Sequence, residues 1–111
     1  MNLTEEKSGK VAVLRVEGRI DALTSPQLEA TLLGIIQRGE RSIVIDLAEV
    51  DYISSAGLRV LLIGAKQMRV SEGSICLASL QIGVKDVLAS TGFMNLFRIF
   101  KSGQSALEEL A

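Results

Sequence analysis

Three short runs of apolar and β-branched residues constrain the fold of this chain more than any other feature of its sequence. They occupy residues 11–16, 42–47 and 74–78, and each has the length of a strand rather than of a helix. The run at 42–47 is almost continuously apolar, as in a strand covered on both faces, so we expect it to be the central strand. Longer segments with helical spacing separate the runs, and this alternation predicts an α/β fold with helices packed on a mixed or parallel sheet.

Helix signals occupy the segments between these runs. Apolar residues recur at helical spacing over residues 28–36, Ser25 is in place to cap that helix, and Pro26 fits its first turn. Gly39 supplies the stop, and a second helical pattern runs from 55 to about 70. The other expected elements are a polar N-terminal stretch paired antiparallel with residues 11–16, a third helix containing Val84 and Leu88, a short strand at 97–100 and a last helix at 104–110.

Length and composition limit the chain to one domain with a core of its own. Of its 111 residues, 48% are apolar, 23% are charged and one is proline, which excludes disordered, collagen-like and low-complexity classes. We therefore expect a single domain over residues 1–111 that folds alone. The polar start of the chain lacks the apolar segment of a signal peptide, and no apolar run reaches the roughly 18 residues of a membrane span. These features predict a soluble cytoplasmic protein with no membrane partner.

Charge and residue usage exclude several classes of function. Twelve basic residues offset thirteen acidic ones, so general nucleic-acid binding is not expected. The chain has no histidine and one cysteine, Cys76, which removes histidine-dependent triads, histidine zinc sites and an intrachain disulfide. The glycine loops of nucleotide-binding enzymes and the glycine-flanked serine of hydrolases do not occur either. We therefore predict no catalytic residue, no metal and no cofactor, and we expect Cys76 to be a buried structural thiol.

Two loops are expected at the carboxyl ends of strands, where functional sites gather in open α/β sheets. They span residues 21–25 and 51–57, and in the second loop Ser54 and Ser55 open a helix that is almost entirely apolar. A serine at a helix start accepts a hydrogen bond from an unpaired backbone N–H, and the same end of the helix favours added negative charge. Such a serine is prepared for phosphorylation, and an ordinary N-cap without regulation is the alternative.

Around these loops the sequence resembles a known family, the STAS domains of bacterial anti-sigma-factor antagonists. Residues 52–58, Tyr-Ile-Ser-Ser-Ala-Gly-Leu, are similar to the family's signature at a helix start, and residues 17–26 look like its Gly-x-x-Asp turn. The resemblance covers nearly the whole chain in order, spacing and length. It implies a single STAS-like domain of the α/β class, with a mixed, mostly parallel sheet of about five strands and with about four helices.

The resemblance also implies a phosphorylation site. In the family the regulatory phosphate goes to a serine of this motif, and the corresponding residue is Ser55. The residue before the acceptor is commonly aspartate in the family and is Ser54 here, so Ser54 stays open as the alternative acceptor. Some members carry a second hydroxyl residue where this chain has Ala56, which cannot be phosphorylated.

A partner-binding surface is implied around the same serine. Asp21 would belong to it, unless Asp21 is only a solvated turn residue, and Gly57 either allows close packing or gives a partner access. On the second helix, Val60 and Ile63 lie away from the core-facing stripe, which indicates an exposed apolar docking face or burial under the third helix or the C-terminal segment. The residues assigned to partner binding are Asp21, Thr24, Ser54, Ala56, Gly57, Arg59, Val60 and Ile63.

The function that the resemblance implies is that of an anti-sigma-factor antagonist. Unphosphorylated, the chain would bind an anti-sigma factor, an ATP-binding serine kinase with a histidine-kinase-like fold, and so release the sigma factor. The kinase would phosphorylate the chain, and a PP2C-type phosphatase would reverse the reaction. Two other functions stay open: a constitutive STAS interaction scaffold in a sensor or transporter-associated assembly, and a domain that binds a small molecule or nucleotide.

Overall fold

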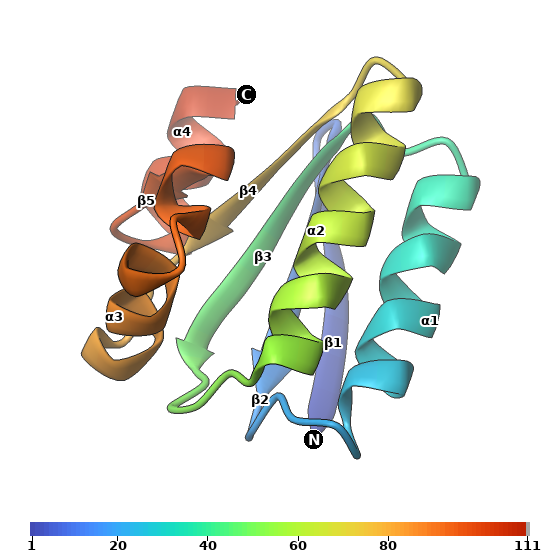
Figure 1. Ribbon diagram of the computed structural model, residues 1–111. Coiled ribbons are helices and arrows are strands. Elements are labelled where there is room, and N and C mark those ends of the chain that lie inside the picture. Colours follow the sequence, from blue (N-terminus) through green and yellow to red (C-terminus); the bar gives the residue numbers. More distant parts are fainter. Residues whose placement is uncertain (111) are drawn as a thin grey trace.

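The computed structural model describes residues 1–110 as a five-stranded sheet with helices on both faces (Figure 1). The strands follow one another across the sheet in chain order; β1 is antiparallel to β2, and the other neighbouring pairs are parallel. The elements are β1 (Asn2–Ser8), β2 (Val11–Glu17), α1 (Ser25–Gln37), β3 (Ser42–Glu49), α2 (Ser55–Val70), β4 (Ser74–Ala78), α3 (Ile82–Ser90), the 3-10 helix η1 (Phe93–Leu96), β5 (Arg98–Phe100) and α4 (Gly103–Leu110). The predicted α/β class, mostly parallel sheet and number of helices are confirmed.

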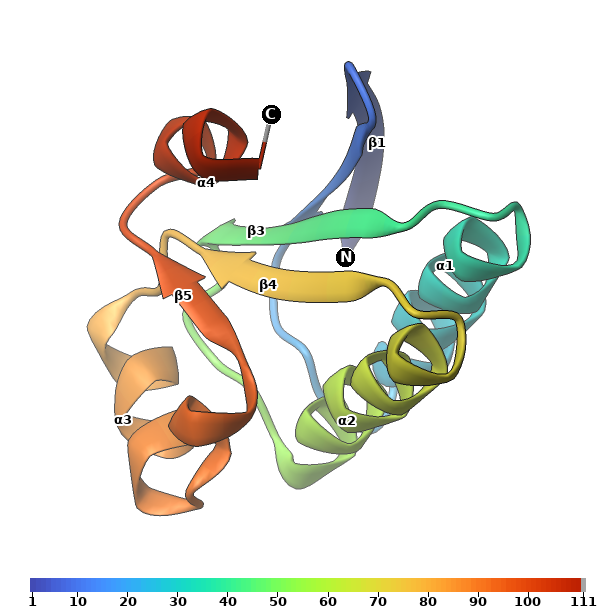
Figure 2. The same cartoon turned by 90° about the horizontal axis from the view of Figure 1, so that it is seen from above.

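Alternating side chains along the strands divide the core into two layers. Ile45 and Leu77 belong to the larger layer, which the helices α1 and α2 cover, whereas Val44 and Cys76 belong to a smaller layer closed by α4. Figure 2 shows α4 on one side of the sheet and α1 and α2 on the other. Because β3 sends fully buried residues into both layers, the prediction of a central strand at 42–47 is confirmed.

The polar N-terminal stretch forms the edge of the sheet. It pairs with β2 along its whole length, from Asn2 opposite Glu17 to Ser8 opposite Val11, as predicted. Its exposed side chains are mostly charged or polar, and Lys7 makes an ion pair of 2.7 Å with Glu40, which follows α1. Charged side chains on an edge strand oppose pairing with another chain, so this edge is protected.

The start of α1 differs by one residue from the sequence prediction. Thr24, not Ser25, occupies the N-cap position, and Ser25 is the first residue of the helix, with its hydroxyl donating to the carbonyl of Asp21 at 2.6 Å. The Thr24 hydroxyl does not cap the helix: it accepts a hydrogen bond from the N–H of Asp21 at 2.9 Å and donates to the carbonyl of Arg19 at 2.7 Å. Pro26 lies in the first turn, as expected.

The helix α2 is covered more completely than its sequence pattern indicates. Val60 and Gly64 are buried and Ile63 is half-buried, so the prediction of an exposed apolar face is wrong at Val60. A neighbouring helix supplies part of the cover, because a Cβ atom at Gly64 would lie 2.6 Å from Leu32 Cδ2 on α1. At Gly64 the covering element is therefore α1.

The single thiol gives a test of the smaller core layer. Cys76 on β4 is 3% exposed, and burial raises the pKa of its thiol to about 11. Because the thiolate is the reactive form, we expect the native protein not to react with an aromatic disulfide reagent near pH 8 and to react fully in denaturant. The absorbance of the released aromatic thiolate measures both rates. A native rate equal to that of the unfolded chain would contradict the burial of Cys76.

Candidate functional site

Two loops meet at the carboxyl edge of the sheet, where β2 leads into α1 and β3 leads into α2. Ile20 and Ile53 form an isolated parallel bridge beyond the ends of the strands. The backbone N–H of Ile20 donates to the carbonyl of Tyr52 at 3.0 Å, and that of Ser54 donates to the carbonyl of Ile20 at 2.8 Å. The prediction that the two loops share one edge is therefore confirmed, and the loops are joined directly by hydrogen bonds.

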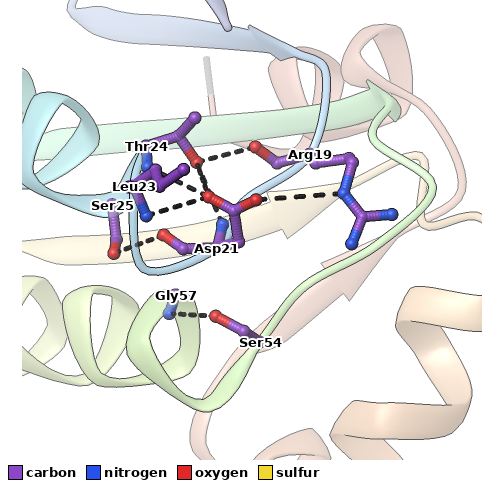
Figure 3. Close-up of polar contacts among 7 residues, drawn as sticks. All are labelled: Arg19, Asp21, Leu23, Thr24, Ser25, Ser54 and Gly57. Carbon is purple, nitrogen blue, oxygen red and sulfur yellow. Dashed lines mark hydrogen bonds and ion pairs between the residues drawn. The ribbon is translucent and has the colours of Figure 1, made fainter.

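The two serines at the start of α2 have different environments. Ser54 is the N-cap, with extended backbone, and its Oγ accepts a hydrogen bond from the N–H of Gly57 at 3.4 Å (Figure 3). Ser55 is the first helical residue and is exposed, and its hydroxyl makes no hydrogen bond within residues 1–110. Ser54 thus has a structural role in holding the helix start, while the oxygen of Ser55 is free to react.

Asp21 organises the loop between β2 and α1. Its Oδ1 accepts hydrogen bonds from the backbone N–H groups of Leu23 at 3.0 Å and Thr24 at 3.1 Å, and its Oδ2 lies 3.9 Å from Nε of Arg19 (Figure 3). The hydrogen bond from the Thr24 backbone is the main cause that lowers the pKa of Asp21 below its usual value, with the Thr24 hydroxyl, the Leu23 N–H and Arg19 adding to it. Asp21 is therefore ionised at neutral pH, and its negative charge is held within the loop that is hydrogen-bonded to the start of α2 through Ile20.

Gly57 allows the two loops to approach each other. A Cβ atom at this position would lie 2.5 Å from Ile20 Cγ2 and 2.8 Å from Ile53 Cγ1, closer than real side chains come. Both isoleucines are buried in the main core layer. Of the two roles considered for Gly57, close packing therefore has direct support in the geometry.

Three exposed apolar side chains flank this site, and sequence reasoning did not find them as functional candidates. Leu23 is 91% exposed at the tip of its loop, Ile82 is 79% exposed in the first turn of α3, and Tyr52 is also exposed. The guanidinium of Arg19 lies 4.2 Å from the centre of the Tyr52 ring. An apolar residue in a polar loop was the only sequence signal at Leu23, and Ile82 could have been found because it precedes the buried stripe of α3.

The start of α3 belongs to the same region of the molecule. The side chain of Gln81, its N-cap residue, donates to the carbonyl of Ala48 at 2.7 Å. A Cβ atom at Gly83 would lie 3.4 Å from the carbonyl oxygen of Asp51 in the loop before α2. Ile82 therefore stands beside the β3–α2 connection, and we call Leu23, Tyr52 and Ile82 the apolar rim of the site.

The remaining predicted partner contacts differ in accessibility. Arg59 is exposed one turn after Ser55, Ala56 is half-buried, and Thr24 is half-buried with its hydroxyl engaged in its own loop. Val60 is buried and does not reach the surface.

Within residues 1–110 no group of three metal-ligating side chains lies close enough to hold an ion. None of the helices described is long and apolar enough to cross a membrane.

The chain is similar to known proteins along almost its whole length. A family model described as the STAS domain matches residues 2–106. The Bordetella bronchiseptica protein BtrV, named as a candidate anti-sigma factor antagonist, is 39% identical over 106 residues, which cover 96% of this chain and 91% of that protein. A Thermotoga maritima crystal structure described in the same terms has a TM-score of 0.91 at 21% identity, covering 96% of this chain and 92% of that one. The phosphorylated form of SpoIIAA, a Bacillus cell fate determinant, has a TM-score of 0.78 at 16% identity, covering 99% of this chain and 100% of that one.

The packing at Gly57 is open to a direct test. We expect Gly57→Ala to lower the free energy of unfolding by roughly 1–3 kcal/mol, because overpacking against Ile20 and Ile53 outweighs the better helix propensity of alanine. The matched control is Gly34→Ala on α1, where nothing lies within 4 Å of the added Cβ. The free energy of unfolding of this control should rise by up to about 1 kcal/mol, because alanine favours the helix more than glycine does. Urea unfolding measures both variants, and a gain in stability for Gly57→Ala would overturn the role of close packing.

Proposed function

This chain belongs to the STAS domain family, and on that premise we propose that it is an anti-sigma factor antagonist whose binding is switched by phosphorylation of Ser55. The observation that carries the proposal is the exposed, unengaged hydroxyl of Ser55 at the start of α2, next to a loop with an ionised Asp21. The partner is an anti-sigma factor that is itself a serine kinase. A PP2C-type phosphatase restores the unphosphorylated form.

The environments of the two serines favour Ser55 as the acceptor. In the reaction, the oxygen of the serine attacks the γ-phosphorus of ATP, ADP leaves, and the hydroxyl proton is lost. The Ser54 oxygen already accepts the N–H of Gly57, so modifying it would disturb the N-cap. Ser55 can be modified without breaking any hydrogen bond found in residues 1–110, and the unpaired N–H groups of the helix start stabilise the added charge.

The switch acts through local charge. A phosphate adds about −1.5 to −2 charges at neutral pH, beside Asp21, which is already ionised. Within the chain, the start of α2 and Arg59 one turn later offset part of this charge. A partner surface that accommodates Asp21 alone then faces two or three negative charges. A hundredfold loss of affinity needs only about 2.7 kcal/mol, which one unfavourable charge contact at an interface can supply.

The apolar rim supplies the anchors for the partner. A few large side chains near the centre of an interface carry much of its binding energy. Charged residues at the periphery of an interface add specificity and raise the association rate. Leu23 and Ile82 stand on different elements on two sides of the loop that ends at Ser55. The anti-sigma factor kinase therefore docks on both side chains and brings the start of α2 toward its bound ATP.

The acceptor is tested by mass spectrometry. Ser55→Ala should gain no mass after incubation with ATP, Mg²⁺ and an extract of the source cell, whereas the wild type should gain about 80 Da on the peptide that contains Ser55. The matched control, Ser54→Ala, should still be phosphorylated, with its free energy of unfolding lowered by about 1 kcal/mol because the N-cap is lost. Full labelling of Ser55→Ala would move the acceptor to Ser54. A lack of label on the wild type, with an active kinase of this kind present, would favour the constitutive scaffold.

The docking surface is tested by affinity for the purified kinase. Ser55→Asp should weaken binding, and Leu23→Ala and Ile82→Ala should each weaken it by roughly 5- to 30-fold, with unchanged circular dichroism. Val70→Ala is the matched control, because Val70 is equally apolar and 81% exposed but lies at the other end of α2. Isothermal titration calorimetry measures the affinity of each of the four variants for the kinase. Equal affinities for the rim variants and the control would remove the rim from the interface.

A further inference from the structure

A hollow of about 380 Å³ lies at the β5 edge of the sheet, away from the loops described above. The residues around it come from the loop after β4, from α3, from η1, from β5 and from the connection to α4. They are Leu80, Lys85, Met94, Ile99, Phe100 and Lys101. None of them belongs to α2 or to the loop between β2 and α1, and none is a residue of the apolar rim, although Leu80 and Lys85 lie on either side of Ile82 in the chain.

The hollow combines apolar walls with two cations. Leu80, Met94, Ile99 and Phe100 are half-buried, whereas Lys85 and Lys101 are exposed. Within residues 1–110, neither lysine has a carboxylate oxygen within 4.0 Å of its ammonium nitrogen, although ion pairs form elsewhere on the surface.

The backbone around the hollow is held in place. Ser79 has a φ of 63°, a left-handed conformation that is uncommon outside glycine, and its N–H donates to the carbonyl of Phe100 at 3.1 Å. This contact fixes the chain between β4 and Leu80 against the end of β5. Two walls of the hollow are thus joined before any ligand arrives, which reduces the cost of binding.

We propose that this hollow binds a small organic anion with an apolar body, such as a medium-chain carboxylate or an alkyl phosphate. Its volume is at the lower end of the range for ligand pockets and holds roughly a dozen water-sized groups. The apolar part lies against Leu80, Met94 and Ile99, which all pack against the larger core layer, and the charged head is placed between the ammonium groups of Lys85 and Lys101. A neutral molecule would make no ion pair with Lys85 or Lys101. A small anion without an apolar part would leave the apolar walls of the hollow in contact with water.

Octanoate is the probe for the first experiment, with the ¹⁵N-labelled full chain observed by NMR. We expect saturable shifts at the amides of residues 80–85 and 94–101. Acetate, which has the head alone, and octanol, which has the body alone, should each bind at least about tenfold more weakly. Equal binding of either control molecule, shifts that map elsewhere, or no saturation in the millimolar range would overturn the proposal.

A pair of double variants separates this site from general attraction to positive charge. Lys85→Gln with Lys101→Gln should weaken octanoate binding by roughly five- to tenfold. The matched control replaces two other exposed lysines without ion pairs in residues 1–110, Lys10→Gln with Lys66→Gln, and should bind octanoate as the wild type does. Equal losses in both double variants would show only screening of net charge and would overturn the proposal.

Vesicles separate a free anion from a lipid headgroup as the source of the ligand. Vesicles of phosphatidylcholine with added phosphatidylglycerol present the same charge on a surface. Cosedimentation that depends on Lys85 and Lys101, together with an absence of octanoate binding, would overturn the small-molecule site in favour of a membrane contact.

Discussion

The parallel pairing of β2 with β3 continues beyond the ends of both strands, and the geometry of the functional site depends on this continuation. Hydrogen bonds run from Gly18 to Glu49, from Ile20 to Tyr52 and from Ser54 back to Ile20. Here the backbones of the two loops hold each other in register. The start of α2 is thereby placed relative to Asp21 by the same interaction that builds the sheet.

This fixed geometry explains why two adjacent serines can have different roles. Ser54 uses its oxygen to satisfy the N–H of Gly57, and Gly57 has no side chain that would push the helix away from Ile20. The helix start is therefore stable without any contribution from the hydroxyl of Ser55. The proposed modification at Ser55 would therefore change the charge of the surface without removing a hydrogen bond that holds the helix start.

The sequence was a good guide wherever one local pattern decided the structure. The buried run at 42–47 could only be a central strand, and Ser54 with an apolar helix after it could only be a helix start. Predictions were wrong where contacts outside the local pattern decided the outcome. Thr24 and not Ser25 holds the N-cap position of α1, and the hydroxyls of both residues bond within the preceding loop rather than to the helix. Val60 is buried because the larger core layer extends beyond a single helical stripe of α2. Leu23 and Tyr52 of the apolar rim were missed because the exposure of a loop side chain is set by neighbouring elements and is not marked by any helical or strand spacing in the sequence.

The range of electrostatic interactions limits what a phosphate at Ser55 can reach. At physiological ionic strength charges separated by more than about 8 Å are largely screened, so the net charge of −1 says little about the switch. For the proposed switch, the charges that matter belong to the two joined loops, where backbone hydrogen bonds from Thr24 and Leu23 help to keep Asp21 ionised. A partner must therefore match this fixed charge when Ser55 is unmodified, and the same close match makes it intolerant of a further negative group. In the proposed switch, high affinity for one form and rejection of the other would thus have a common physical cause, the hydrogen bonds that join the two loops.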